Sequence, residues 1–153
     1  MIRSAVFFAL IAVLGTLAYA EEPAAQEVPV EVRVVDQIDD YVKKNPGQKL
    51  VELQPESRAV RSKVYTLGRR VLGDGLVGYA RGTNSYTSLK NAWAVIRFTG
   101  KVITHVRVTV LQTSNIGRLY VTAGGINRSY ITFVIEAKST RLFNFRADIY
   151  GRR

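Results

Sequence analysis

The residue types that most often carry acid–base or nucleophilic chemistry are scarce in this chain. His105 is the only histidine and there is no cysteine, so neither a histidine metal pair nor a thiolate site can form. His105 falls within an alternating run, opposite the valines and beside Arg107, with no acidic neighbour in sequence to orient its ring. We therefore interpret His105 as an exposed strand residue and not as a general base.

Three carboxylates, Asp74, Glu136 and Asp148, occur in the C-terminal part of the chain. Asp74 lies in a Gly-Asp-Gly sequence that is typical of turns. Glu136 and Asp148 fall on adjacent predicted strands, where basic residues are available to pair with them across the sheet. A glycosidase-type carboxylate pair stays open as the weakest alternative. No phosphate loop, dinucleotide fingerprint or calcium loop is present, so we expect no enzyme activity, no cofactor and no metal.

Basic side chains interleaved with tyrosines are the stronger signal. Arginine binds carboxylate, sulfate or phosphate through its planar fork, and tyrosine adds rigid amphipathic area. The alternative interpretation is a solvated cationic face that only keeps the protein soluble. The tyrosines concerned are Tyr120, Tyr130 and Tyr150, and the candidate anion-binding residues are Arg97, Arg107, Arg118, Arg128, Lys138 and Arg146.

The elements that must position these residues have a period of two. Apolar residues alternate with polar ones along residues 92–98, 102–110, 119–123, 131–137 and 143–149, which predicts strands with one face in a core. Turn-forming residues occur at 81–84, 99–101, 114–117 and 124–127. Closely spaced strands with short turns favour an all-β fold, a single antiparallel β-sandwich or small barrel.

The charge is divided unevenly along the chain. Residues 21–56 hold nine of the twelve acids against four bases, whereas residues 57–153 hold three acids against seventeen bases. We predict an acidic lead segment over residues 21–62, with one short amphipathic helix at about 33–44, and a basic all-β domain over residues 63–153. Arg58-Ala59-Val60-Arg61 is a minimal convertase site, so cleavage after Arg61 would make the lead segment a propeptide.

The N-terminus has the pattern of a secretory signal peptide. A basic start precedes an apolar run from Ala5 to Leu14, and small residues at 18 and 20 precede Glu21. The apolar run is shorter than the about 20 residues of a spanning helix, so we expect no transmembrane anchor. We predict cleavage after Ala20 and a secreted, extracellular protein. In that compartment Asn127, in Asn-Arg-Ser, is a candidate N-glycosylation site.

An ordered series of short motifs resembles the insect multiprotein-bridging-factor-two family. The series begins with Leu67-Gly68-Arg69-Arg70, Gly73-Asp74 and Leu76-Val77, and ends with residues 145–151. The resemblance covers about Tyr65 to Gly151. It implies either a salivary secreted peptide or a gut protein that responds to pathogens, or, from the family's name, a transcriptional coactivator that bridges nuclear factors. No catalytic residue carries over from the family.

These observations favour a secreted, non-enzymatic interaction protein of the salivary or gut type. Its basic sheet would bind an unknown protein or an extracellular polyanion such as a glycan or a microbial envelope, and we expect no nucleic acid partner. The alternatives are the transcriptional coactivator and, less favoured, a carboxylate-based hydrolase. An open sheet with exposed edges could pair with a second copy, and the sequence does not fix the oligomeric state.

Overall fold

The described residues form nine strands in one sheet. The computed structural model describes residues 24–35, 45–59 and 61–152, and it contains no helix within them. The strands are β1 (Gln26–Glu27), β2 (Val30–Val35), β3 (Val51–Leu53), β4 (Ser57–Ala59), β5 (Ser62–Gly68), β6 (Asp74–Thr99), β7 (Ile103–Gln112), β8 (Gly117–Gly124) and β9 (Tyr130–Arg152). The expected all-β class is therefore confirmed.

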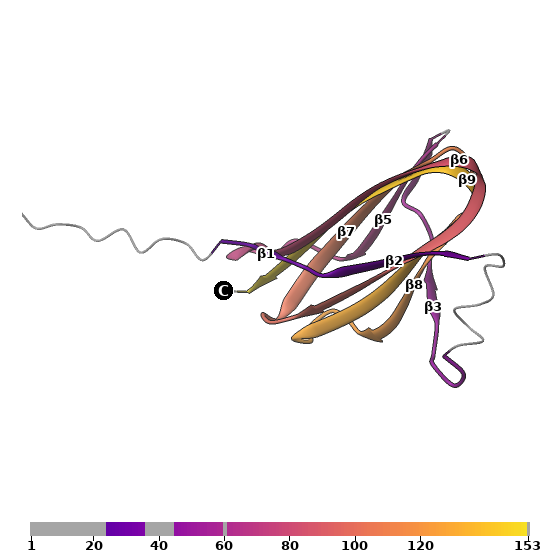
Figure 1. Ribbon diagram of the computed structural model, residues 1–153. Helices are drawn as coiled ribbons and strands as arrows, with labels where there is room; N and C mark the ends of the chain where they lie inside the picture. Colours follow the sequence, from indigo (N-terminus) through magenta and orange to yellow (C-terminus); the bar gives the residue numbers. More distant parts are fainter. Residues whose placement is uncertain (1–23, 36–44, 60, 153) are drawn as a thin grey trace, which may run out of the picture.

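A long antiparallel ladder between β6 and β9 connects the whole sheet. Its register begins at Asp74 opposite Arg152 and ends at Thr99 opposite Tyr130. The pairing shifts between Ser85 and Ala92, where bulges interrupt the regular ladder. Bulges bend strands and increase their twist. In Figure 1 the two strands curve over together at this point and then run back.

The bend divides the sheet into two halves. In the half that we call the β5–β7 half, β7 pairs with β9 along residues 143–151, β5 pairs with β7 and β4 pairs with β5. In the β2–β8 half, β8 pairs with β9 along residues 131–137, β3 pairs with β8 and β2 pairs with β6 along residues 91–96. β1 adds two residues to the β5–β7 half, parallel to β6.

The core is enclosed between the two halves. One hydrophobic cluster contains Ala94, Ile96 and Phe133 from the β2–β8 half together with Val108 and Phe145 from the β5–β7 half. The predicted alternation is confirmed along residues 92–98, 131–137 and 143–149, where every second residue is buried in this cluster. Burial of apolar area, without any disulfide, is what holds the fold together.

One sequence expectation is not confirmed and two are wrong in detail. The strands form one open sheet, so the expected sandwich or barrel is not confirmed. The turn expected at residues 81–84 is instead part of β6, because those residues pair with Phe143–Arg146 of β9. Val102 is 40% exposed and Ile103 is fully buried in its place, since a register shift after Ile103 changes which side chains face inward.

The helix expected at about 33–44 is not present where it can be examined. Residues 33–35 belong to β2, which pairs with Asn91–Ile96 of β6. Four of the six residues of β2 are valine, a β-branched type that favours strands. Residues 36–44 lie outside the described part of the chain, as do the predicted signal peptide and its predicted cleavage point after Ala20.

The shared core predicts that substitutions at nearby positions of β9 differ strongly in their effect on stability. Phe133 is fully buried, whereas Tyr130, three residues earlier on the same strand, is 47% exposed. Phe133→Ala should lower the free energy of unfolding by about 3–5 kcal/mol, because it opens a cavity between the two halves. Tyr130→Ala is the matched control and should cost about 1 kcal/mol or less. Urea unfolding of both variants checks this; equal losses would contradict a core located between the halves.

Candidate functional site

The loop between β5 and β6 is built around one buried carboxylate. Arg70 Nε donates to Asp74 Oδ1 at 2.7 Å, while the Val71 amide and the Thr104 hydroxyl donate to Oδ2 at 2.9 and 2.8 Å. The Asp74 side chain is only 1% exposed. The hydrogen bond from Arg70, with those from Val71 and Thr104, holds the pKa of Asp74 well below its usual range against the opposing effect of burial. Asp74 is therefore a structural group that is ionised at neutral pH.

Glycine is required where the chain enters this loop. Gly68 has a φ of +69°, and a Cβ there would lie 2.3 Å from the Thr104 carbonyl oxygen. Gly73, just before Asp74, also has a positive φ, +82°. The Leu-Gly-Arg-Arg and Gly-Asp motifs of the sequence therefore describe one loop, in which the glycines allow the backbone turns and Arg70 and Asp74 close the loop.

Tyr150 extends this network onto the outer surface of the sheet. The Arg70 guanidinium lies 3.8 Å from the centroid of the Tyr150 ring, and the ring of His105 lies 5.7 Å from it. His105 Nδ1 is 3.3 Å from the Gly68 carbonyl oxygen. His105 is thus half-buried against Tyr150, less exposed than the sequence suggested.

The three carboxylates considered as a hydrolase site do not come together. Glu136 and Asp148 are both on β9 rather than on adjacent strands, and they lie on opposite sides of its bend. Asp148 accepts a hydrogen bond from Arg146 Nε at 3.0 Å, and Asp74 is enclosed in its loop. Among the described residues, no group of three or more acidic, histidine or cysteine side chains could hold a metal ion.

The six candidate anion-binding residues are distributed over the molecule rather than on one face. Arg107 and Arg146 lie on the outer surface of the β5–β7 half, whereas Arg97 and Arg118 lie on the outer surface of the β2–β8 half. The other two are outside both surfaces. Arg128 is in the turn between β8 and β9, and Lys138 is close to the bend of β9.

One compact basic and aromatic surface remains, which we call the arginine–tyrosine face. It consists of Arg81, Arg107, Arg146, Tyr79 and Tyr150. In the register, Arg146 lies between Arg81 of β6 and Thr109 of β7, and Tyr79 is opposite Asp148. Tyr79 and Arg81 are not among the candidates from the sequence, because a turn is expected at residues 81–84 and the alternating runs begin only at residue 92. The alternation of Tyr79, Arg81 and Thr83 with Ala80 and Gly82 was the signal that could have identified them.

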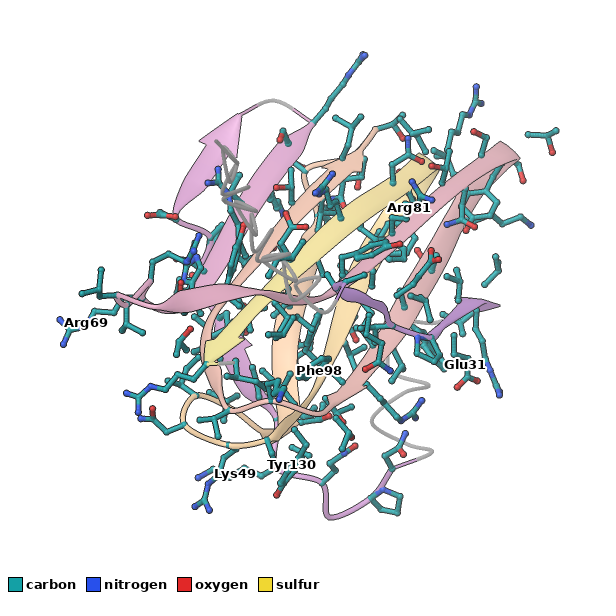
Figure 2. The ribbon with its side chains drawn as sticks, turned by 90° about the vertical axis from the view of Figure 1, so that its left-hand side faces the viewer. Glu31, Lys49, Arg69, Arg81, Phe98 and Tyr130 are labelled. Carbon is teal, nitrogen blue, oxygen red and sulfur yellow. The ribbon has the colours of Figure 1, made fainter. Side chains whose placement is uncertain are left out.

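Acidic residues of the lead segment contact the other outer surface. Glu31 of β2 lies 3.7 Å from Arg97, and Glu52 of β3 lies 3.8 Å from Arg118. On the arginine–tyrosine face, Asp148 pairs with Arg146, and Glu27 lies 3.8 Å from Arg81 with both side chains more than half exposed. Figure 2 shows Glu31 and Arg81 in different regions of the sheet. Among the described acidic residues of the lead segment, Glu31 and Glu52 therefore pair with the β2–β8 half and Glu27 pairs with the arginine–tyrosine face.

The two proposed modification positions both occupy turns with positive φ. Asn127 is exposed, has a φ of +62°, and its amide donates to the Ile103 carbonyl at 2.8 Å. Arg61, with a φ of +78°, lies in the tight turn between β4 and β5, and its carbonyl oxygen accepts a hydrogen bond from the Gln112 amide at 2.9 Å. Glycosylation and cleavage at these positions stay predictions.

Within residues 24–35, 45–59 and 61–152, no helix has the length and apolarity that crossing a membrane would require.

Comparison with known proteins gives one match. The model of a family described as transcription activator MBF2 matches residues 67–151, which include the Asp74 loop and most of the paired strands. No curated protein and no solved structure matches the chain. The match confirms the resemblance at the level of the family but gives no support for an insect or salivary type.

The family description corrects the main functional expectation. A secreted, extracellular protein of the salivary or gut type does not agree with a family of transcription activators. The expectation of export depends on the signal-like N-terminus, whereas the family match depends on residues 67–151. The match favours the alternative that was held open, a transcriptional coactivator.

The Asp74 loop predicts an acid-dependent loss of stability. The pKa of Asp74 is lowered by folding, so its contribution is complete above the ordinary value of 3.8 and is lost as the pH falls below it. Asp74→Asn should lower the free energy of unfolding at pH 7 by about 2 kcal/mol, and the difference from the unmodified protein should shrink at acid pH. Asp148→Asn is the control, since its ion pair with the largely exposed Arg146 should contribute about 1 kcal/mol or less. Denaturant unfolding across the acid range measures both; a pH-independent effect of Asp74→Asn would contradict the ionised role.

Proposed function

Because the chain belongs to the MBF2 family of transcription activators, we propose that it is a transcriptional coactivator that bridges nuclear factors. The family match is the observation that carries this proposal. Most of the matched residues lie in the long ladder and in the strands beside it, so the family is defined largely by this folded sheet and by the Asp74 loop. The protein acts by binding, without catalysing a reaction.

The geometry of the sheet supports a bridging role. Because the sheet bends over on itself, its two outer surfaces are turned away from each other, with the core between them. One small domain can therefore contact two proteins at the same time. The arginine–tyrosine face is one contact surface, and the outer surface of the β2–β8 half, together with its edge strand β2, is the other.

The chemistry of the arginine–tyrosine face indicates its partner. Arg107 makes no ion pair within the described residues, and Arg81 is largely exposed. Tyr150 and Tyr79 provide half-buried rings beside them. Such a surface is complementary to an acidic segment that also carries apolar side chains, because arginine binds carboxylates and tyrosine covers apolar groups. We propose that the partner is an acidic segment of a transcription factor.

A reporter assay with matched charge-reversal variants tests this function. The chain is expressed with a sequence-specific activator and a reporter that this activator controls. Arg81→Glu, Arg107→Glu and Arg146→Glu combined should abolish the increase in reporter signal, because the face then repels an acidic segment. The control combines Arg69→Glu, Arg128→Glu and Lys138→Glu. These exposed residues lie outside the face, and Figure 2 shows Arg69 directed away from the strands. This control changes the net charge equally and should retain the increase.

The same two variants distinguish a specific surface from net charge. If both lose activity to the same extent, overall charge and not the arginine–tyrosine face is responsible. Direct binding of the purified protein to the activator should weaken as salt rises, because exposed charges are screened. Retention on DNA alone, with no binding to the activator, would contradict the bridging mechanism. No increase in the reporter with the unmodified chain present in the nucleus would contradict the coactivator function itself.

A further inference from the structure

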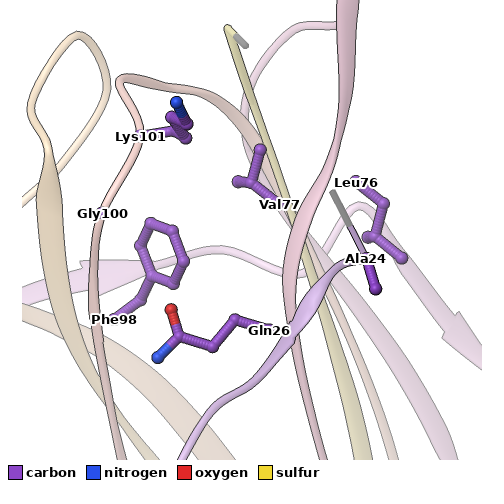
Figure 3. A pocket seen from close by; sticks show the side chains of 7 residues that line it. All are labelled: Ala24, Gln26, Leu76, Val77, Phe98, Gly100 and Lys101. Atoms are coloured by element: carbon purple, nitrogen blue, oxygen red, sulfur yellow. The ribbon is translucent and has the colours of Figure 1, made fainter. Parts of the chain in front are cut away.

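A cavity lies at the open end of the fold, far along the sheet from the bend. Its volume is about 410 Å³, and it is lined by Ala24, Gln26, Leu76, Val77, Phe98, Gly100 and Lys101. Figure 3 shows Phe98, Val77 and Gln26 around the space, with Lys101 at its upper edge. Leu76 and Val77 are near the start of β6 and Phe98 is near its end, so the cavity exists only because β6 bends back on itself.

Two glycines keep the cavity open against Phe98. At Gly78, a Cβ would lie 2.7 Å from Phe98 Cε2, so the absence of a side chain lets the ring pack against the opposite end of its own strand. At Gly100, a Cβ would lie 3.3 Å from Phe98 Cζ. Phe98 itself is only 2% exposed, and Gly100 places no side chain between the edge of this ring and the cavity. The backbone at Gly100 is not in the left-handed region, so that position can accept a larger residue.

The lining combines apolar walls with a single charge. Leu76, Val77 and Phe98 form the apolar part, and the polar side chains are the Gln26 amide and the Lys101 ammonium. Lys101 is exposed, and no ion pair among the described residues involves it. Among the residues that the structure describes, no acidic side chain lines the cavity. Its volume is within the range of about 300–1,000 Å³ that is usual for ligand pockets.

We propose that this cavity is a binding site for an amphipathic carboxylate, a straight-chain fatty acid of medium length. The hydrocarbon chain lies along Val77 and the ring of Phe98, where it is removed from water. The carboxylate lies at the rim, where the Lys101 ammonium pairs with it, whereas Gln26 lies at the opposite end of the space. This site is separate from the arginine–tyrosine face and does not depend on the coactivator function.

Three ligands with the same ten-carbon chain and different head groups test the head-group specificity of the cavity. Decanoate, decan-1-ol and decyltrimethylammonium are titrated below their micelle concentrations into the full chain, and the backbone amide signals of Val77, Phe98 and Gly100 are followed by NMR. Decanoate should shift these signals most strongly and bind about tenfold more tightly than decan-1-ol, since a charge-assisted contact contributes about that factor. Decyltrimethylammonium should bind most weakly. Equal affinity for all three ligands, or no shift at these amides, would overturn the proposal.

Three variants separate the roles of charge and cavity. Lys101→Gln should remove the preference for decanoate over decan-1-ol, and Lys101→Glu should reverse it in favour of decyltrimethylammonium. Gly100→Leu should abolish binding of all three ligands by filling the space beside Phe98. Lys138→Gln, a cation lost near the bend, is the matched control and should bind as the unmodified protein does. Lys101 is an exposed side chain, so its variants remain informative if Gly100→Leu does not fold. Unchanged selectivity in Lys101→Glu would refute the proposed contact.

Discussion

The paired length of β6 and β9 is the constraint on which the rest of the structure depends. Every other strand is attached to this ladder directly, or through β7, β8 or β5. If these strands were straight, the sheet would be a single layer, and its apolar face would be exposed to water. Bulges around residues 85–92 allow the ladder to bend, so that each half covers the apolar face of the other. The cost of interrupted pairing at the bend is offset by the burial of side chains such as Phe133 and Phe145 in one core.

The Asp74 loop shows how short family motifs can be structural rather than catalytic. A carboxylate with one donor from a guanidinium, one from a backbone amide and one from a hydroxyl has little capacity left for chemistry. The loop also fixes the start of β6, and through Arg70 it positions the ring of Tyr150 on the outer surface. The stability of the fold and the shape of the arginine–tyrosine face therefore share one loop. The motifs of the family therefore belong to the loop and the sheet that hold the arginine–tyrosine face in place.

The outer surfaces differ in how their charges are balanced. Glu31 and Glu52, which belong to the acidic part of the sequence, pair with Arg97 and Arg118 because β2 and β3 add to the β2–β8 half as edge strands. Acidic residues from one part of the sequence thus pair with basic residues from the other part in the folded structure. On the opposite surface, Arg107 makes no ion pair within the described residues, and this is the surface that we propose receives an acidic partner.

The sequence by itself determined the all-β class, the faces of most strands, and the scarcity of groups for catalysis, because a two-residue period and residue counts are local properties. It also contained the motifs of the family. Only the tertiary structure decided that the runs at 131–137 and 143–149 form one strand, since a bulged bend and a turn have similar residue preferences. It likewise decided that Arg97 and Arg107 lie on opposite outer surfaces and that Arg81 lies beside Arg146. Which side chains become neighbours depends on the register between strands that are distant in sequence, and no local sequence pattern encodes that register.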